Sequence, residues 1–390
     1  MIEPRGKTAT RAWIPVAGVL AGAGWGSNQF TPMLLIYHAR LGLSTSTLEA
    51  LFGAYAAGLI PGLVLAGRWS DAHGRRPVGI SASVVSLLAT LSLALGTHAL
   101  ALLFLGRLLA GVGSGAAFGA GTAWLRETSL PPFGDADASV IARRAAVAMT
   151  AGFALGPLVA GTLAQWAPAA TALPYLPHIV LMIVVLLGLR GAPETVQPHQ
   201  VASRAISLPA ESARRFRRFV VPAAPWVFAA PAIAFALLPS VVGTGHSADG
   251  VALTAAITSL TALAGVMIQP LARRFEAGAL LGLIVMGGGL VLAAVAADAR
   301  ETWLLFPCAI VLGSAYGLCL VGGLLEVQRL APPGALAALT ATFYVFTYLG
   351  FAAPYLMTVA APAAGYAVLL LIASGLVFLT AALVNVQRTV

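Results

Sequence analysis

The chain has 390 residues, of which 59% are hydrophobic and 9% are charged. Soluble domains carry about 25% charged residues, so this chain cannot cover a water-facing surface, and a soluble globular fold is excluded. The net charge of +9 does not indicate a nucleic-acid partner, because the basic residues flank apolar segments, where membrane topology explains them. We therefore predict an all-α polytopic membrane protein.

A membrane-spanning helix needs about 20 mostly apolar residues. Twelve segments satisfy this condition: 12–37, 47–66, 78–97, 100–124, 142–165, 171–189, 221–242, 250–270, 277–297, 303–325, 335–358 and 363–385. The first segment is too long for the core of a signal peptide, so we interpret it as a retained span. The sequence thus predicts twelve transmembrane helices.

The lysines and arginines predict how these spans are oriented. With the N-terminus in the cytoplasm, all but three of the 22 basic residues lie on the cytoplasmic side. The exceptions are Arg40 and Arg300 on the outer side and Arg107 within a span. The opposite orientation would reverse the preference of cytoplasmic loops for basic residues. We predict a multi-pass protein of the bacterial cytoplasmic (inner) membrane, with both termini in the cytoplasm.

The longest polar interruption, residues 191–219, divides the chain into two halves of six spans, 1–190 and 220–390. This linker ends in a basic cluster, Arg214 to Arg218. We interpret the cluster as a topology determinant in contact with anionic membrane lipids; the alternative is a regulatory site.

A polar, basic stretch from Gly67 to Pro77 lies between the second and third predicted spans. It matches the pattern Gly-x-x-x-Asp-x-x-Gly-Arg-Arg through Gly67, Asp71, Gly74, Arg75 and Arg76. With this motif at this position, the chain resembles the major facilitator superfamily of secondary transporters over essentially its whole length. The resemblance implies two pseudo-symmetric six-helix bundles. It also implies that the Asp and the arginines form a latch that closes the cytoplasmic side in the outward-open state.

Two further acids resemble family positions that join this latch: Glu127, at the end of the fourth span, and Glu194, after the sixth. For all these charged residues the alternative is ordinary solvated loop charge. A shift of 198 residues superposes several glycines and arginines of the two halves, which predicts an internal duplication. The superposed pairs are Gly67 with Gly265, Arg75 with Arg273, Arg76 with Arg274, Gly115 with Gly313, and Gly119 with Gly317. Asp71 falls on Gln269 and Gly74 on Ala272, so we expect the latch mainly in the first half.

Arg107, in the fourth span, is the charge that lies clearly inside the predicted membrane region. A charge near the bilayer centre costs about 2.5–3.5 kcal/mol on insertion scales, which makes it a functional candidate. The family resemblance implies proton transfer or recognition of substrate charge; the alternative is hydrogen bonding to first-span carbonyls or to Gln29. His178, in the sixth span, is a second coupling candidate, since histidine titrates near neutral pH. Its alternative is a hydrogen-bonded core residue.

All thirteen acidic residues fall at span ends or in loops. Many proton-coupled exporters of cations carry a carboxylate deep in a span, where burial raises its pKa. With Arg107 and no buried acid, the cavity of this chain would be positive. We therefore expect a neutral or anionic substrate.

The fifth span contains the element Gly152-x-x-x-Gly156-Pro157-x-x-x-Gly161. It resembles an element typical of drug/proton antiporters within the superfamily. Glycines four residues apart make one smooth helix face, and the proline bends the helix. Such a helix at the interface of the halves would suit a seal against leakage, although helix packing alone also explains the glycines.

Polar and aromatic side chains in otherwise apolar spans are candidates for the substrate cavity. They are Asn28, Gln29, Tyr37, Trp226, Gln269, Tyr316, Tyr344 and Tyr348. The alternative for any one aromatic is packing or anchoring at the membrane interface. No metal-ligand spacing, nucleophile or phosphate-binding loop occurs in the sequence, so we expect no metal, no cofactor and no enzymatic activity.

These features favour a proton-coupled exporter of small amphipathic molecules or drugs, working as a monomer by alternating access. One alternative is a facilitator or symporter that imports a small neutral or anionic metabolite. Another is a membrane scaffold or receptor without transport. The charged hinge and glycine-rich spans argue against the scaffold, because a scaffold needs no switchable interface.

Overall fold

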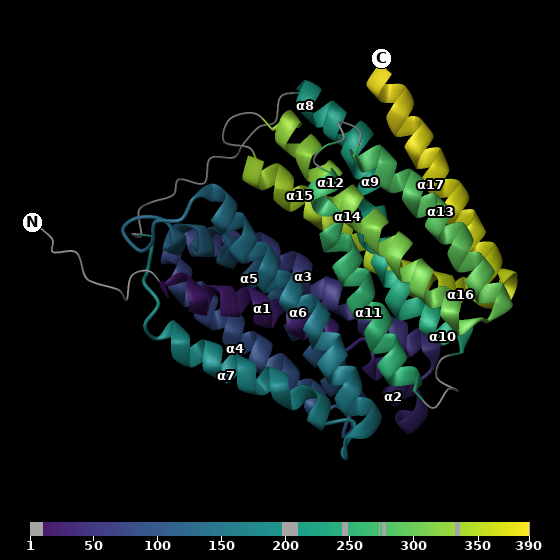
Figure 1. Cartoon of the computed structure of the whole chain (residues 1–390), viewed down its shortest axis with the longest axis horizontal. Helices are drawn as coiled ribbons and strands as arrows, with labels where there is room; N and C mark the ends of the chain where they lie inside the picture. The colour runs from purple at the N-terminus through teal and green to yellow at the C-terminus, as the bar shows by residue number, and fades with distance from the viewer. Residues whose placement is uncertain are drawn as a thin grey trace, which may run out of the picture. The chain divides into compact units, whose positions relative to one another are not determined.

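The computed structural model describes residues 11–196, 210–243, 249–272, 274, 278–331 and 336–389. Within these ranges every regular element is a helix (Figure 1). Ten of the helices in this part of the chain are long and apolar enough to cross a membrane, and Leu173–Leu189 forms a shorter apolar helix. The predicted all-α membrane fold is confirmed, whereas the count of twelve spans stays a prediction.

The first predicted span, 12–37, is interrupted. Helix α1 covers Trp13–Asn28, and helix α2 covers Met33–Leu41. Pro32 precedes α2 as its cap, and a proline at this place cannot continue the hydrogen-bonding ladder of the preceding helix. At 1.5 Å per residue the 16 residues of α1 are about 24 Å long, which is shorter than a bilayer core.

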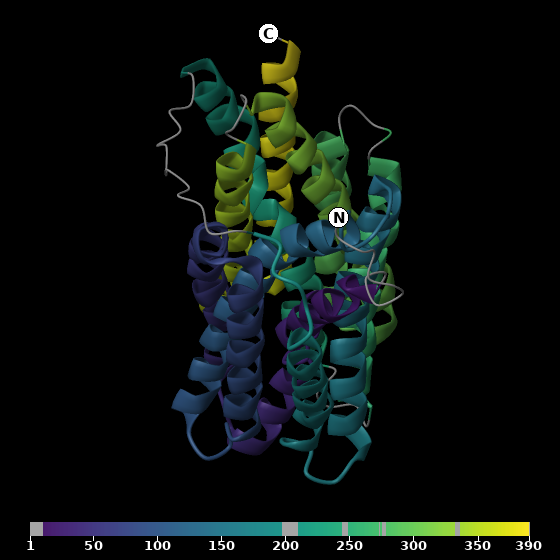
Figure 2. The same ribbon diagram turned by 90° about the vertical axis from the view of Figure 1, so that its left-hand side faces the viewer.

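The helices form two compact units by their contacts. The first unit comprises Met1–Phe30 and Ala54–Ser203, and Figure 2 shows its helices, in purple to teal, running side by side. It contains α1, most of α3 (Thr45–His73), α4 (Arg75–Ala94), α5 (Leu100–Ser129), α6 (Ala138–Trp166), the short η2 (Leu173–Tyr175) and α7 (Leu176–Leu189). Helix α1 packs against α4, α5, α6 and α7. The core of the unit includes Leu20, Trp124 and Met182.

The second unit comprises Thr31–Gly53 and Arg204–Val390. Its helices, in chain order, are α2, the first turns of α3, α8 (Ala210–Arg215), η3 (Phe216–Val220), α9 (Val221–Ala232), η4 (Ile233–Leu237), α10 (Leu238–Val242), α11 (Gly250–Met267), α12 (Gln269–Ala272), α13 (Gly278–Ala299), η6 (Thr302–Leu304), α14 (Leu305–Leu330), α15 (Leu336–Tyr348), η7 (Leu349–Ala352), α16 (Ala353–Ala364) and α17 (Tyr366–Thr389). Helix α14 packs against α9, α11 and α13, and α13 also packs against α17.

The boundary between the units lies after Ser203, inside the predicted linker 191–219. Residues 197–209 of that linker lie outside the described residues. Residues 31–53 belong by sequence to the first half but by contacts to the second unit. The division into domains 1–190 and 220–390 therefore stays a prediction. The contacts assign residues 31–53 to the second unit, whereas the prediction placed them in the first domain.

The superposed glycines of the two halves make the same kind of helix contact. A Cβ atom at Gly115 of α5 would collide with the Leu59 carbonyl oxygen of α3, and one at Gly313 of α14 would collide with the Thr261 carbonyl oxygen of α11. Only glycine lets two helix backbones approach this closely. These contacts agree with the predicted duplication, although one superposed residue, Arg273, lies outside the described residues.

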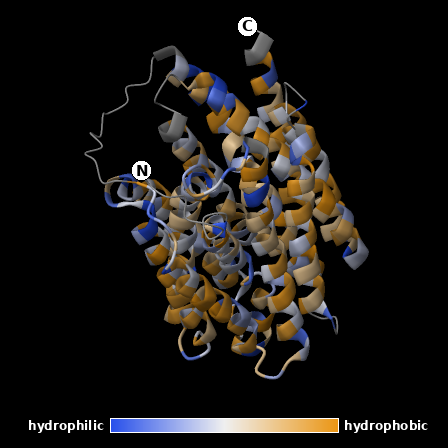
Figure 3. Ribbon diagram, turned by 60° about the vertical axis from the view of Figure 1, so that its left-hand side comes forward, coloured by the Kyte–Doolittle hydropathy of each residue, from blue (hydrophilic) through white to orange (hydrophobic). Residues whose placement is uncertain are grey.

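The outward faces of the helices are apolar. Figure 3 shows hydrophobic residues along most of the helix surfaces and hydrophilic residues mainly at helix ends and in loops. Large exposed apolar side chains line α7, such as Val180 and Val184, and α17, such as Ile372 and Leu379. Exposed apolar surface of this extent is stable in lipid rather than in water. The chain is a multi-pass membrane protein.

Candidate functional site

The charged junction between α3 and α4 brings the predicted latch residues together inside the first unit. Gly74 separates the two helices with a φ of +104°, a conformation that suits glycine. A Cβ atom at this position would also collide with the carboxylate of Glu194. Both observations explain why a glycine stands between Asp71 and Arg75.

The guanidinium of Arg75 lies between two carboxylates. Its Nη1 atom is 2.5 Å from Oδ1 of Asp71, one helical turn earlier, and its Nη2 atom is 3.2 Å from Oε1 of Glu127 on α5. Nη1 also donates to the hydroxyl of Ser70 at 3.1 Å. Arginine hydrogen bonds to carboxylates are stronger than neutral ones, so Arg75 ties the end of α3 to the end of α5.

Glu194 caps the first turn of α4. Its carboxylate accepts hydrogen bonds from the backbone N–H groups of Arg75 at 2.8 Å and Arg76 at 2.9 Å, and also from those of Thr195 and Val196. The first N–H groups of a helix have no partner within the helix, and the helix dipole favours an anion there. Burial raises the pKa of this carboxyl, but the four backbone donors outweigh burial and hold the pKa of Glu194 below its ordinary value.

Further contacts join the chain after α7 to the same junction. Nη2 of Arg76 donates to the Arg190 carbonyl at 2.6 Å, and Nε1 of Trp124 donates to the Pro193 carbonyl at 3.0 Å. The Thr195 hydroxyl donates to the Glu127 carboxylate. Asp71 and Glu127 thus contact the Arg75 side chain, and Glu194 contacts the backbone of Arg75 and Arg76. The role of these residues as a latch stays a prediction. Gly67 lies one turn before Asp71, and a Cβ atom added there would have no neighbour within 4 Å.

Arg107 is fully enclosed in the first unit, with 1% of its surface exposed. Its guanidinium carbon lies 4.7 Å from the centre of the Phe30 ring and 4.8 Å from that of Tyr55. Nη1 donates to the carbonyl of Ser27 in α1 at 3.2 Å. Cation–π contacts and a first-span carbonyl therefore stabilise the charge of Arg107. The amide nitrogen of Gln29 donates to the Thr90 hydroxyl instead.

His178 uses both ring nitrogens in a buried hydrogen-bond network. Nε2 lies 2.9 Å from the Gly22 carbonyl and Nδ1 lies 2.8 Å from the Thr90 hydroxyl. A carbonyl can only accept, so Nε2 carries a proton and donates. The Gln29 side chain donates to the same Thr90 hydroxyl at 3.2 Å. This arrangement fits a structural histidine that joins α7 to α1 and α4; its role in coupling stays a prediction.

The glycines of the antiporter-like element face α1 within the first unit. A Cβ atom at Gly152 would collide with the Ala21 carbonyl oxygen, and one at Gly156 would lie 2.8 Å from the Trp25 carbonyl oxygen. Pro157 lies inside α6, and Gly161 is buried. The smooth face predicted for this helix thus provides close packing against α1.

Three of the predicted cavity residues meet in an aromatic cluster of the second unit. Its centre is Phe228 of α9, whose ring lies 4.5 Å from Tyr348 in a stacked arrangement and 5.5 Å from Tyr316. Phe351 stacks on Phe228 at 5.1 Å, and Tyr344 lies 6.2 Å from Tyr348. We define the aromatic cluster as Phe228, Tyr316, Tyr344, Tyr348 and Phe351.

Neither Phe228 nor Phe351 is among the cavity residues predicted from the sequence. Tyr344, Tyr348 and Phe351 follow an i, i+4, i+7 spacing, which places them on one helix face, so this spacing could have located Phe351. Phe228 has no such signal, because it joins the cluster from another helix.

The other predicted cavity residues lie elsewhere. Asn28 donates to the Phe153 carbonyl of α6 at 3.4 Å, and Nε1 of Trp226 donates to the Thr380 hydroxyl of α17 at 3.2 Å. Tyr37 is buried in α2, and Gln269 begins the short helix α12. Asn28 belongs to the first unit, whereas Tyr37, Trp226 and Gln269 belong to the second.

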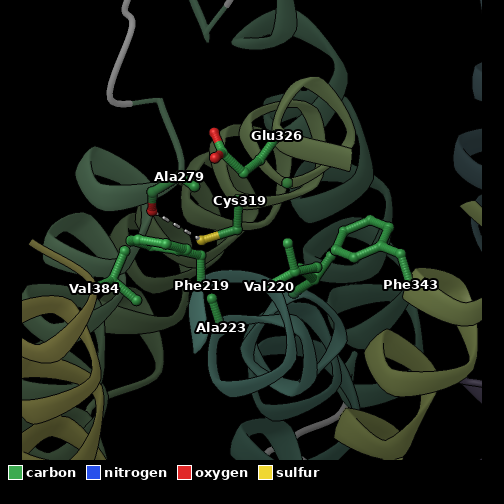
Figure 4. Close-up of a pocket in the computed structure, with 10 residues that line it drawn as sticks. Phe219, Val220, Ala223, Ala279, Cys319, Glu326, Phe343 and Val384 are labelled. Carbon is green, nitrogen blue, oxygen red and sulfur yellow. Dashed lines mark hydrogen bonds between the residues drawn. The ribbon is translucent and has the colours of Figure 1, made fainter. Parts of the chain in front are cut away.

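Two of the cavities formed by described residues lie in the second unit. The first, drawn in Figure 4, lies among α9, α14, α15 and α17 beside Cys319 and Glu326 and holds about 20 Å³, too little for a substrate. The second holds about 540 Å³ and is lined by Thr45, Ser240, Asp298, Arg300 and Tyr366, among others. Its volume lies in the range of small-molecule sites, and we call it the polar cavity.

Glu49, near the start of α3, corrects the expectation that no acid is buried. Its position at a span end agrees with the sequence, but only 2% of its surface is exposed. The first turns of α3 belong to the second unit, so this side chain lies in a protein interior rather than in a solvated loop. Counting the charged residues along the sequence gives no indication that Glu49 is buried.

The helical architecture, the apolar outward faces and the charged α3–α4 junction define a multi-pass membrane transport protein. A family model described as Major Facilitator Superfamily matches residues 16–355. The chain belongs to this superfamily, whose members are transporters of small molecules rather than enzymes.

Curated relatives match a short segment. Multidrug resistance protein MdtL of Klebsiella pneumoniae (strain 342) is 36% identical over 88 residues, which cover 23% of this chain and 22% of the relative. The protein of the same name from Citrobacter koseri is 32% identical over 90 residues, 23% of each chain. The chain thus spans less than a quarter of the length of these relatives.

Solved structures match over nearly the whole chain. A POT family transporter in complex with 5-aminolevulinic acid has a TM-score of 0.80 at 12% identity, covering 97% of this chain and 96% of that one. Nucleoside transporter NupG has a TM-score of 0.72 at 13% identity, covering 98% and 100%. At these identities the similarity shows the fold alone.

Replacing Glu194 tests the cap of α4. Glu194→Ala removes the acceptor of four backbone N–H groups, so we expect a lower Tm of the purified protein, equivalent to about 1 kcal/mol. The pKa of Glu194 is lowered in the folded protein. The contribution of Glu194 to the free energy of unfolding is therefore complete above the ordinary pKa of a carboxyl group, and it is lost as the pH falls through the folded-state pKa. Asp135→Ala, at an exposed position, is the control. If the Tm difference between the wild type and Glu194→Ala stayed the same at acid pH, Glu194 would not be the ionised cap of α4.

Proposed function

We propose that the chain is a proton-coupled exporter of small amphipathic molecules in the bacterial cytoplasmic membrane, working as a monomer by alternating access of two six-helix bundles around a midplane site. The aromatic cluster carries this proposal. The rings of Phe228, Tyr348 and Phe351 stack nearly parallel to one another, and the three tyrosines of the cluster each carry a phenolic hydroxyl. Such a surface suits flat amphipathic molecules.

Two further observations support export. The segment shared with the multidrug resistance proteins named MdtL is short but exceeds 30% identity. The antiporter-like element from Gly152 to Gly161 packs tightly on α1 through its glycines, which suits a helix that has to resist leakage.

We propose that the junction around Arg75 is the cytoplasmic latch of this transporter. Its charges lie at the ends of α3, α4 and α5 and are partly exposed, with 48% of the Asp71 side chain and 31% of the Glu127 side chain accessible, so water can replace each partner when the contact opens. Arg107 and His178 are the proposed coupling residues of the first unit. Arg107 keeps a positive charge in the interior of the first unit, and the buried Glu49 adds no negative charge while it is protonated. This favours neutral or anionic substrates over cations.

Arg107 also favours a second candidate function. A buried guanidinium suits an importer of a small anionic metabolite, either a facilitator or a proton symporter. Import by symport and export by antiport differ in the direction in which protons move with the substrate.

Transport by the purified protein in liposomes tests the proposed function. An acidic lumen should drive accumulation of a neutral or anionic aromatic dye, and addition of the dye without an imposed gradient should make the lumen alkaline. Symport would acidify the lumen instead, and flux that ignores the pH gradient would exclude proton coupling. A matched cationic dye is the control, and its preferential movement would contradict the proposed substrate charge.

Replacing Phe228 tests the substrate site. Stacking on an aromatic ring is worth about 1 kcal/mol, so Phe228→Ala should raise the KM for a flat aromatic dye about fivefold. Phe228→Tyr keeps the ring and should restore the KM. Phe306→Ala, at a phenylalanine that is 42% exposed, is the matched control. An unchanged KM in Phe228→Ala would remove the aromatic cluster from the substrate site.

Replacing Asp71 tests the latch. Asp71→Asn leaves Arg75 with one carboxylate in place of two, so we expect slow or abolished transport with substrate affinity largely intact. Initial rates in liposomes and ligand-induced thermal shifts measure the two quantities separately, with Asp135→Asn as control. A mutant that transports at the full rate would reduce the junction to a topology signal.

A further inference from the structure

Glu49 is a carboxyl group buried in the second unit, with 2% of its surface exposed. Its Oε2 atom has no hydrogen-bond partner, and no ion pair to Glu49 occurs among the described residues. An ionised carboxylate in such surroundings loses several kcal/mol of hydration, and a group in this position binds a proton instead. The surroundings of Glu49 therefore fit the neutral acid.

The same helix face connects Glu49 to the polar cavity. Ser44 caps α3 by accepting a hydrogen bond from the Thr47 N–H at 3.2 Å, so the helical register of the following residues is well defined. Thr45 lines the polar cavity, and Glu49 follows four residues later, one turn along the same face. The residue that lines the cavity and Glu49 are therefore about one helical turn apart along α3.

The next residue on this face leads to the aromatic cluster. Phe52 follows Glu49 by three residues, and its ring lies 5.3 Å from Phe351 and 5.9 Å from Phe235, edge-on in both pairs. Phe351 stacks on Phe228. Glu49 thus lies between a polar cavity that reaches solvent and the residues proposed to bind the substrate.

The charged and titratable neighbours of this face are few. Asp298, Arg300 and Tyr366 line the polar cavity, and Asp298 and Arg300 are exposed. On α2, Tyr37 is buried, while His38 and Arg40 are exposed; Asp249, before α11, is exposed as well. Helix α10 and the segments η4 and η7 carry no titratable side chain. Asp249 and Asp298 are already exposed to water, whereas Glu49 is buried. Glu49 is therefore the acid of this face whose charge would change if water reached it.

We infer that Glu49 is a proton-binding carboxyl group of the transport cycle, which exchanges its proton with the polar cavity. The inference rests on the proposed proton coupling and names a residue for it. Glu49 is neutral while the first turns of α3 pack in the second unit. A rearrangement that lets water reach this face favours the carboxylate and releases the proton, so proton binding and conformation are linked.

Infrared difference spectra of the purified protein between acid and alkaline pH test proton binding without transport. The wild type should show a protonated carboxyl band that is missing in Glu49→Gln and present in Asp298→Asn, the control at the polar cavity. Persistence of the complete band in Glu49→Gln would overturn the inference. Glu49→Asp, which should keep a band, serves if the glutamine variant does not fold.

Transport assays then separate this inference from the proposed function. Glu49→Gln should lose gradient-driven dye accumulation by a factor on the order of ten or more, yet retain exchange of dye across the membrane without a gradient. Accumulation at the wild-type level would overturn the role of Glu49 in coupling. A wild type without dye-linked proton movement would refute the proposed antiport, whereas a band lost in Glu49→Gln would still identify Glu49 as the proton site.

Discussion

A charge in a membrane protein has to be paired, neutralised or kept in water, because hydrocarbon cannot solvate it. This constraint accounts for the polar features of the chain. Arg75 lies between Asp71 and Glu127 at the ends of helices. Arg107 lies inside the first unit between two aromatic rings and a backbone carbonyl. Glu49 has no ion pair among the residues that the structure describes and fits the neutral acid. Each of these three arrangements can change in a different way during a transport cycle.

Close helix packing makes these arrangements possible. Gly115 and Gly313 let α5 approach α3 and α14 approach α11 until their backbones are nearly in contact. Backbones this close leave no space for water or lipid, so the polar groups between them have to satisfy one another. The network of Ser27, Tyr55 and Ser114 shows this, with hydroxyl distances of 2.7 and 3.2 Å. The same glycine positions serve both units, which agrees with a duplicated architecture.

The proposed substrate and proton sites belong to one continuous part of the second unit. Thr45, Glu49 and Phe52 share a helix face that reaches from the polar cavity to the aromatic cluster. This face belongs by sequence to the first half and by contacts to the second unit. A segment with this dual membership is well placed to link a change in one half to the binding site in the other, which alternating access requires.

Sequence alone was enough to predict the class of protein, its all-helical character and the residues of the α3–α4 junction. Apolar length and the Gly67–Arg76 motif are local signals, and a turn with fixed spacing brings its own side chains together. The burial of Glu49, the place of Phe228 in the aromatic cluster and the membership of residues 31–53 in the second unit emerge only from the folded chain. These facts depend on which distant helix covers a given face, and neither composition nor periodicity within a helix specifies its neighbour. The glutamate at position 49 is the same residue in a loop or a core; its surroundings decide whether it carries a charge.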